Sequence, residues 1–257
     1  MLVTKPVLDH VAIGTAAVVD GWELFGGVLG GAWVYGGDSP GFWWGQLRYC
    51  AGPKVELITP TSSPDSAFLE RFLSARGPGP HHLNFIVPDI SGTLQEVRRL
   101  GIEPVGVNLE NANWKEGFLH PRDAYGIVIQ VAEQSGRPPE LAPPAGLPSP
   151  GPSCAFALVE HYVDDLAGAM RLFGEVLAGE VVSCRDAGSG PVAELSWENG
   201  ARLRLAQAAL PTAAKVGTRS GTPGSLYFAR EVQPFSPAER SRVACLSERL
   251  GVSLTLS

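Results

Sequence analysis

A histidine near the start of an apolar strand, with a helix directly after the strand, occurs twice in the first half of this 257-residue chain. The strand that begins at His82 has the alternation and the branched and aromatic content typical of β structure. A helix is expected next over residues 92–100, with Ser91 as its N-cap and Gly101 ending it. The earlier copy contains His10 and also leads into residues with helical spacing. A duplicated strand–helix unit therefore constrains the fold more than any other feature.

Further strands extend each unit into a βαβββ module. In the first module these strands are expected at residues 30–35, 43–50 and 55–58. The second module is expected to close with a strand over residues 127–131. Glu56 follows His10 by 46 residues (56 − 10), and Gln130 follows His82 by 48 residues (130 − 82), so a polar residue recurs in the last strand of both modules.

The second half of the chain predicts a weaker version of the same architecture. Residues 134–153 are rich in Pro, Gly and Ser and are expected to form a linker. We therefore predict a domain of two modules over residues 1–133 and a second, degenerate domain of the same type over residues 154–257. The last module is short, with two strands and a helix opened by Ser236.

The polar residues inside the apolar strands form a candidate metal site. A buried carboxylate such as Glu56 needs a compensating charge, because burial removes its hydration. If the two modules pack around a pseudo-two-fold axis, His10, Glu56, His82 and Gln130 converge. Two imidazoles, a carboxylate and an amide oxygen suit one divalent ion of Zn, Co, Ni, Mn or Fe. The alternative for each residue alone is a hydrogen-bonded core position or a solvated strand face.

Composition limits the partners of the chain. Twenty basic and 26 acidic residues give a net charge of −6 without a basic patch, so neither nucleic acid nor an anionic membrane surface is an expected partner. No apolar run reaches the roughly 18 residues that a membrane span needs, and the N-terminus has no apolar targeting segment, so we expect a cytoplasmic protein. The four cysteines show no paired spacing, so neither a disulfide framework nor a thiolate zinc site is expected.

Taken together, the motifs resemble the vicinal oxygen chelate superfamily, also called the glyoxalase/bleomycin-resistance fold, and within it the methylmalonyl-CoA epimerase family. The matching motifs are Leu8-Asp9-His10-Val11-Ala12-Ile13, Val55-Glu56-Leu57, the segment from His81-His82 to Asp89-Ile90, and Phe118-Leu119-His120-Pro121-Arg122-Asp123 followed by Gly126 to Gln130. The resemblance covers residues 7 to about 133. It implies an α+β fold in which paired βαβββ modules form a cupped, barrel-like mixed sheet around a metal, with a second, incomplete domain of the same type. Its metal positions fall on the four residues of the candidate site, so the domain over residues 1–133 is expected to bind metal. In the second half, alignment of the modules places Leu158 and Ser225 where histidines would be and Arg204 where an acid would be, so the domain over residues 154–257 is expected to be metal-free.

The chain departs from that family at the catalytic carboxylates. The family places a glutamate at the position of Gln130, and an amide cannot take a proton at neutral pH. Its second catalytic glutamate would fall near residues 39–42, where the chain has no carboxylate. The remaining candidates for a catalytic base are Glu56, which would also bind the metal, and His120, for which a turn role before Pro121 is the alternative.

Three functions remain open on this basis. The first is a metal-dependent isomerase, epimerase or lyase that acts on a small oxygenated or acyl-thioester substrate through an enolate. The second is a non-haem iron dioxygenase, since two histidines and one carboxylate form the donor set of that class. The third is a non-catalytic ligand-binding or resistance protein. Substrate specificity is expected in the loops over residues 36–45 and 103–117, and the open sheet edge of the short last module predicts a homodimer.

Overall fold

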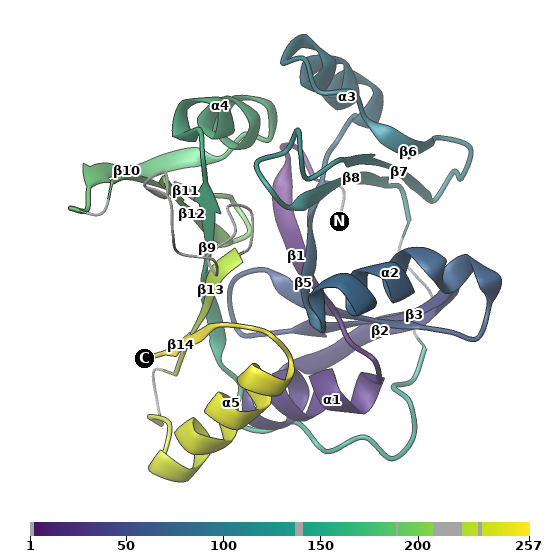
Figure 1. The fold of residues 1–257 in the computed structure, drawn as a ribbon, viewed down its shortest axis with the longest axis vertical. Helices are drawn as coiled ribbons and strands as arrows, with labels where there is room; N and C mark the ends of the chain where they lie inside the picture. The colour runs from purple at the N-terminus through teal and green to yellow at the C-terminus, as the bar shows by residue number, and fades with distance from the viewer. Residues whose placement is uncertain (1–2, 137–140, 189, 208–222, 231–232) are drawn as a thin grey trace. The chain divides into compact units, whose positions relative to one another are not determined.

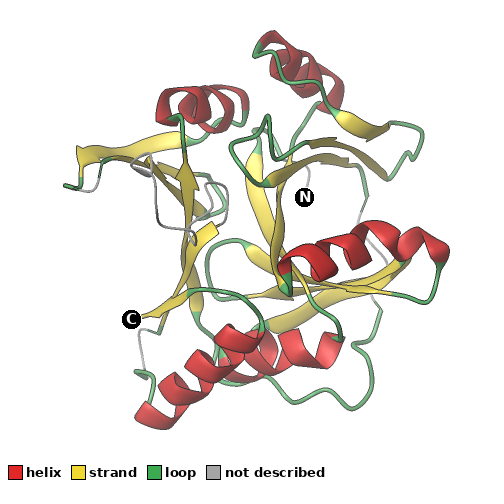
Figure 2. Ribbon diagram, in the orientation of Figure 1, coloured by secondary structure: helices red, strands yellow, loops and turns green. Residues whose placement is uncertain are grey.

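The computed structural model describes residues 3–136, 141–188, 190–207, 223–230 and 233–257. The fold is α+β, with one mixed sheet of eight strands and a second sheet of six (Figures 1 and 2). Three complete βαβββ modules are followed by a shorter unit of one helix and two strands among the described residues. The predicted fold class, a cupped mixed sheet of paired modules with an incomplete second set, is confirmed.

The eight-stranded sheet contains the first two modules in the order β2-β3-β4-β1-β5-β8-β7-β6. Its strands are β1 (Val7–Gly14), β2 (Ala32–Ser39), β3 (Phe42–Arg48), β4 (Lys54–Pro60), β5 (Gly79–Ile86), β6 (Val105–Asn108), β7 (Trp114–Leu119) and β8 (Val128–Gln134). Within each module the first strand is parallel to the last, as in β1 with β4 and β5 with β8, and the remaining pairs are antiparallel. Both modules thus have the same internal topology, which is the outcome expected of a repeat.

The six-stranded sheet contains the third and fourth modules in the order β10-β11-β12-β9-β13-β14. Its strands are β9 (Ala155–Val163), β10 (Glu180–Asp186), β11 (Pro191–Ser196), β12 (Arg202–Gln207), β13 (Pro223–Ala229) and β14 (Leu254–Leu256). Parallel pairing again joins the first strand of each module to its last, β9 with β12 and β13 with β14.

Five α-helices lie among the described residues: α1 (Val18–Trp22), α2 (Ala67–Arg76), α3 (Ile90–Arg99), α4 (Leu166–Met170) and α5 (Pro237–Arg249). Wider π-helical turns, Glu23–Val28 and Arg171–Val176, continue α1 and α4. The predicted N-cap of α3 is wrong by two residues, because the Asp89 carboxylate accepts the Gly92 N–H at 3.0 Å and Asp89 has the extended backbone of a cap. Gly101 ends this helix as expected, with a φ of 81° that disfavours other residues.

The two segments expected as specificity loops are largely strand. Residues 36–45 form the tip of the β2–β3 hairpin, and residues 103–117 contain β6 and the start of β7. Both segments are rich in Gly, Asn or charged residues, so their propensity is weak, and cross-strand pairing decides their conformation. The helix α2, which lies between the first two modules, was not predicted from the sequence.

The chain divides into two compact units, and each unit combines segments from both sequence halves. The first unit contains residues 1–9, 82–137 and 158–224, and the second contains residues 10–81, 138–157 and 225–257. In the first unit the ring centroid of Phe85 lies 6.0 Å from that of Phe173 and 5.5 Å from that of Trp197. In the second unit the Phe228 ring lies 5.0 Å from Tyr49. Hydrogen-bonded sheets therefore follow the order of the chain, whereas the cores combine its two halves.

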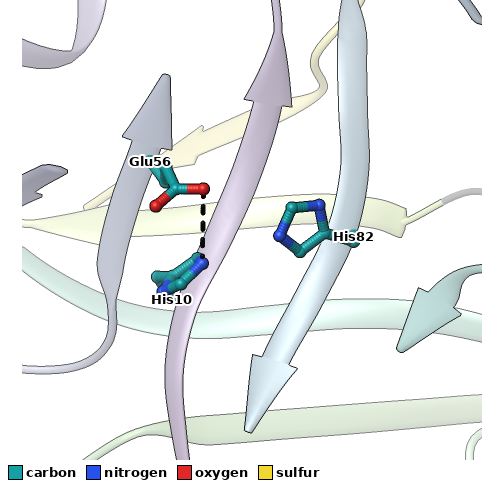
Figure 3. Close-up of side chains that lie close together, drawn as sticks. All are labelled: His10, Glu56 and His82. Atoms are coloured by element: carbon teal, nitrogen blue, oxygen red, sulfur yellow. Dashed lines mark ion pairs between the residues drawn. The ribbon is translucent and has the colours of Figure 1, made fainter. Parts of the chain in front are cut away.

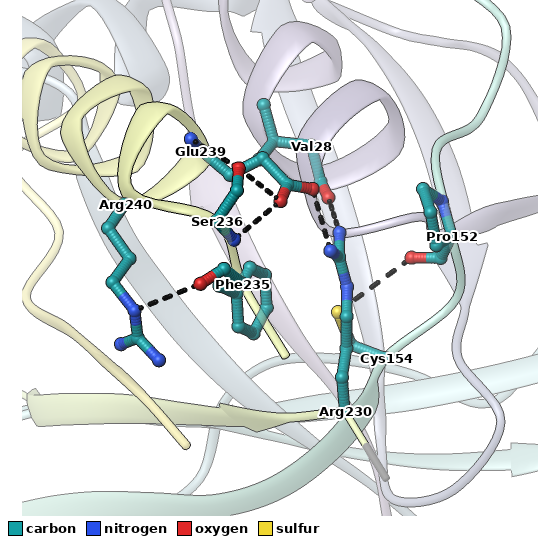
Figure 4. Close-up of polar contacts among 8 residues, drawn as sticks. All are labelled: Val28, Pro152, Cys154, Arg230, Phe235, Ser236, Glu239 and Arg240. Carbon is teal, nitrogen blue, oxygen red and sulfur yellow. Dashed lines mark hydrogen bonds and ion pairs between the residues drawn. The ribbon is translucent and has the colours of Figure 1, made fainter. Parts of the chain in front are cut away.

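A buried arginine joins the fourth module to the first inside the second unit (Figure 4). The Arg230 guanidinium donates to the Val28 carbonyl at 2.7 Å and to Glu239 at 2.6 Å, and it lies 4.0 Å from the Phe235 ring centroid. Ser236 and Glu239 form a reciprocal capping box at the start of α5, as the Ser-Pro helix signal predicted. Arg230 therefore fixes the end of the first helix and the start of the last helix together.

The described part of the predicted linker packs on the first module. The Trp22 indole donates to the Pro148 carbonyl at 2.9 Å, and the Trp33 indole donates to the Leu141 carbonyl at 2.6 Å. Residues 137–140 of that linker lie outside the described residues. The domain boundaries drawn from the sequence remain a prediction. No helix in the described ranges has the length and apolarity needed to cross a membrane.

Candidate metal centre

In the first module, three polar side chains gather on one face of β1, β3 and β4. The register sets Glu56 opposite Ala12, two residues after His10, and sets Gln46 opposite Glu56 on the other side. His10 Nε2 lies 3.6 Å from Glu56 Oε1. The Gln46 amide nitrogen donates to Glu56 Oε2 at 2.7 Å and lies 3.3 Å from His10 Nδ1. His10 and Glu56 are 1% and 8% exposed, so the structure buries a carboxylate next to an imidazole.

The second module repeats this register with different side chains. Gln130 on β8 lies opposite Asn84 on β5, and Asn84 is two residues after His82. The Asn84 amide nitrogen donates to Gln130 Oε1 at 2.9 Å, and Gln130 Nε2 donates to Glu116 Oε2 at 2.7 Å. The Trp114 indole donates to the same Glu116 oxygen at 2.8 Å. The equivalence of Glu56 and Gln130, predicted from spacing alone, therefore corresponds to equal positions in the strand register.

His10, Glu56 and His82 each offer one ligand atom, and these atoms all lie within 4.8 Å of one another (Figure 3). All three residues are buried. Two imidazoles and a carboxylate form a donor set that suits a divalent transition metal. Gln130, the fourth predicted ligand, is buried on the same face of the sheet as His82, and its amide is held between Asn84 and Glu116.

Apolar side chains continue the first-module face beyond the polar group. Ala12, Ile58 and Leu69 form a buried cluster, and Trp44 and Phe72 pack against it. Since Leu69 and Phe72 belong to α2, this helix covers the part of the face next to His10 and Glu56. Trp44 contributes to this surface, whereas the neighbouring Trp43 stacks on Trp33 with their ring centroids 6.2 Å apart.

The two other histidines of this half have different surroundings. His120, a predicted candidate base, is exposed, and its Nδ1 accepts the Arg122 N–H at 3.1 Å in the turn before β8. His81 packs 4.8 Å from the Phe72 ring. Burial, with a smaller effect of the Arg76 charge, lowers the pKa of His81 to about 4. Neither contact indicates metal binding.

In the third module, an arginine stands where the first module has its carboxylate. Arg204 lies opposite Glu160, two residues after Leu158, so Leu158 and Arg204 correspond in register to His10 and Glu56. The Arg204 guanidinium lies 3.3 Å from Glu160 and 3.3 Å from Glu194. These are the substitutions that the sequence alignment of the modules predicted. In this module a guanidinium balances two largely buried carboxylates.

Sequence reasoning missed three polar residues of the candidate site: Gln46, Asn84 and Glu116. Each interrupts an apolar alternation on a strand, and Asn84 follows His82 by two residues, the spacing of side chains on one strand face. That spacing could have indicated Asn84 beforehand. Gln46 and Glu116 could not be assigned without the antiparallel register of β3 and β7.

Comparison with known proteins supports the fold. A scan against protein-family models found no match, and a search of curated proteins found no significant match. Among solved structures, a triple mutant of 4-hydroxymandelate synthase from Streptomyces coelicolor is similar over 98% of this chain and 75% of its own length, with a TM-score of 0.59 and 12% identity.

Shorter solved structures match about half of the chain. Methylmalonyl-CoA epimerase from Mycobacterium tuberculosis is 27% identical over 53% of this chain and 94% of its own, with a TM-score of 0.44. A hypothetical protein from Bacillus halodurans is 25% identical over 53% of this chain and 100% of its own, with a TM-score of 0.46. The match to the synthase, which spans nearly the whole chain, confirms the predicted fold.

Proposed function

We propose that this protein is a metal-dependent enzyme that isomerises, epimerises or cleaves a small oxygenated or acyl-thioester substrate through an enolate. The metal would be held by His10, Glu56 and His82, with Gln130 as the fourth ligand. The observation that carries the proposal is the proximity of three buried donor atoms, all within 4.8 Å of one another. Burial of a carboxylate among imidazoles is costly unless a charge compensates it, and a divalent cation does so.

The charge of the donor set supports a Lewis-acid role. Two neutral imidazoles and one carboxylate around a divalent ion leave a net charge of about +1 and open coordination positions. When bound, such an ion polarises substrate oxygens and stabilises a developing enolate.

The surrounding amides would position the ligands. Gln46 holds one oxygen of Glu56, which leaves the other oxygen facing His10. Asn84 and Glu116 hold the two ends of the Gln130 amide. Hydrogen bonds of this kind orient metal ligands and tune their affinity. We assign Glu56 as the base that takes the substrate proton, because it is the carboxylate within the donor set; His120, engaged in its turn, is the weaker candidate.

A second candidate function is a non-haem iron dioxygenase. The specific observation in its favour is that the cluster contains two histidines and one carboxylate, the donor set of that class. Oxygen uptake with ferrous iron would support this function. Incorporation of solvent deuterium into substrate with Co, Ni, Mn or Zn, without oxygen, would support the first.

The test is metal analysis of the purified protein beside His10→Ala and His82→Ala. We expect both variants to lose the bound ion, while a His120→Ala control, altered at an exposed turn, retains it. Full metal retention in His10→Ala and His82→Ala would refute the site. Metal binding without turnover of any substrate would favour the ligand-binding alternative.

We further propose that the protein acts as a cytoplasmic homodimer. Support for the dimer comes from β14 at the edge of the six-stranded sheet, because the backbone N–H and C=O groups of an edge strand can pair with a strand of a second copy. Sedimentation of the purified chain would test the dimer.

A further inference from the structure

A chain of hydrogen bonds crosses β7, β8 and β5 and ends at a buried oxygen. Trp114 and Gln130 donate to the Glu116 carboxylate, and Asn84 donates to the Gln130 carbonyl. Asn84 is completely buried, and its own carbonyl oxygen has no hydrogen-bond partner among the described residues. A buried acceptor without a partner costs about 1–3 kcal/mol, and such groups in folded proteins usually have a role.

The carboxylate at the end of this series of hydrogen bonds fixes which group of each amide donates and which accepts. An ionised carboxylate only accepts hydrogen bonds, so Glu116 requires the amino group of Gln130. The Gln130 carbonyl must then face Asn84, which in turn presents its amino group. Rotating either amide by 180° would bring two oxygens together. The Asn84 oxygen is therefore held as an acceptor, and the negative charge at Glu116 strengthens it through the polarised amides.

The position of this oxygen relates it to the candidate centre. Asn84 follows His82 by two residues on β5, so both side chains leave the same face of the strand. The equivalent residue of the first module is Ala12, which lies opposite Glu56 as Asn84 lies opposite Gln130. The fold thus accepts alanine at this position, and the amide at Asn84 is a specific feature of the second module.

We propose that Asn84 determines specificity at the proposed metal site: its carbonyl oxygen accepts a hydrogen bond from a hydroxyl group of the bound substrate. This inference rests on the proposed function. It narrows the substrate class to compounds in which a chelating oxygen carries a hydrogen, such as 2-hydroxy acids, and disfavours ligands that chelate only through oxygens without hydrogen.

The test uses Co²⁺-loaded protein and two probe ligands of equal charge, glycolate and its methyl ether methoxyacetate. Ligand binding is followed by the visible spectrum of the cobalt ion and by calorimetry, so that no turnover is required. We expect the unaltered protein to bind glycolate about tenfold more tightly than methoxyacetate, because only glycolate has the hydroxyl hydrogen. In Asn84→Ala this ratio should fall to within about twofold. Asn84→Leu, which keeps a similar volume but has no acceptor, should show the same fall, so that the change in ratio reports the hydrogen bond and not the space made for the ether methyl group.

Two further variants separate the outcomes. Asn84→Leu, of similar volume, replaces Asn84→Ala if the latter does not fold. Glu116→Gln removes the charge that orients the amides of Gln130 and Asn84. We expect this variant to reduce the preference for glycolate over methoxyacetate without abolishing cobalt binding. An unchanged ratio in Asn84→Ala would refute the inference and leave the metal site intact. A protein that shows no cobalt spectrum at all, with or without His10→Ala, would instead refute the proposed function.

Discussion

Replacement of Arg204 by methionine tests whether a guanidinium compensates buried charge in the third module. Arg204 lies 3.3 Å from Glu160 and 3.3 Å from Glu194, and the two carboxylate side chains are 14% and 10% exposed. Methionine preserves most of the apolar volume of the side chain and removes only the charge and its donors. The variant therefore leaves two largely buried carboxylates without their shared cation.

The expected loss follows from this burial. Breaking a fully buried ion pair by removing one partner costs about 3–5 kcal/mol. Arg204 is 23% exposed, and Glu194 keeps a contact with Arg202, so the lower end of that range applies. We expect Arg204→Met to lower the free energy of unfolding by about 3 kcal/mol, or the melting temperature by roughly 10 °C.

The assay is denaturant unfolding of Arg204→Met, of the double variant Arg204→Met/Glu160→Gln and of an Arg202→Met control. The double variant should regain about 1–2 kcal/mol, because one uncompensated charge is gone. The control removes a cation that is 46% exposed and should cost less than about 1 kcal/mol. A loss below about 1 kcal/mol in Arg204→Met, or no recovery in the double variant, would show that the guanidinium does not compensate these carboxylates.

Three further predictions concern the candidate centre and the second unit. Gln46→Leu removes the hydrogen bond to Glu56, and we expect metal affinity measured by competition with a chelator to fall about 10–100-fold; unchanged affinity would contradict a positioning role. Arg230→Met leaves the Val28 carbonyl without its donor and should lower unfolding free energy by about 3 kcal/mol, whereas an effect under about 1 kcal/mol would argue against the buried link. The Arg230 guanidinium, helped by the capping bonds, holds the pKa of Glu239 at about 2, below its usual 4.5. The stability that ionised Glu239 contributes to the fold is therefore complete above pH 4.5 and is lost as the pH falls towards 2. The difference in melting temperature between the unaltered protein and Glu239→Gln should shrink over that interval, and a constant difference would refute the linkage.

Much of the fold could be read from the chain because its signals are local and repeated. Strand alternation, the histidine at the head of two modules and the Ser-Pro start of α5 are properties of short segments, and the structure has an element at each of these places. The equivalence of Glu56 and Gln130 was also accessible, because equal spacing in a duplicated unit implies equal register. The predicted N-cap of α3 failed because Asp89 and Ser91 are both good caps, and the backbone before the helix decides between them.

The sequence by itself determined the module order, the paired histidines and the equivalent positions of Glu56 and Gln130 in their modules. The tertiary structure alone decided which modules share a core, because burial joins segments that are distant along the chain while strand pairing joins near ones. It also decided that Gln46, Asn84 and Glu116 accompany the predicted ligands. Their roles depend on which side chains meet across neighbouring strands, and a shift of one residue in register would turn each of them to the opposite face.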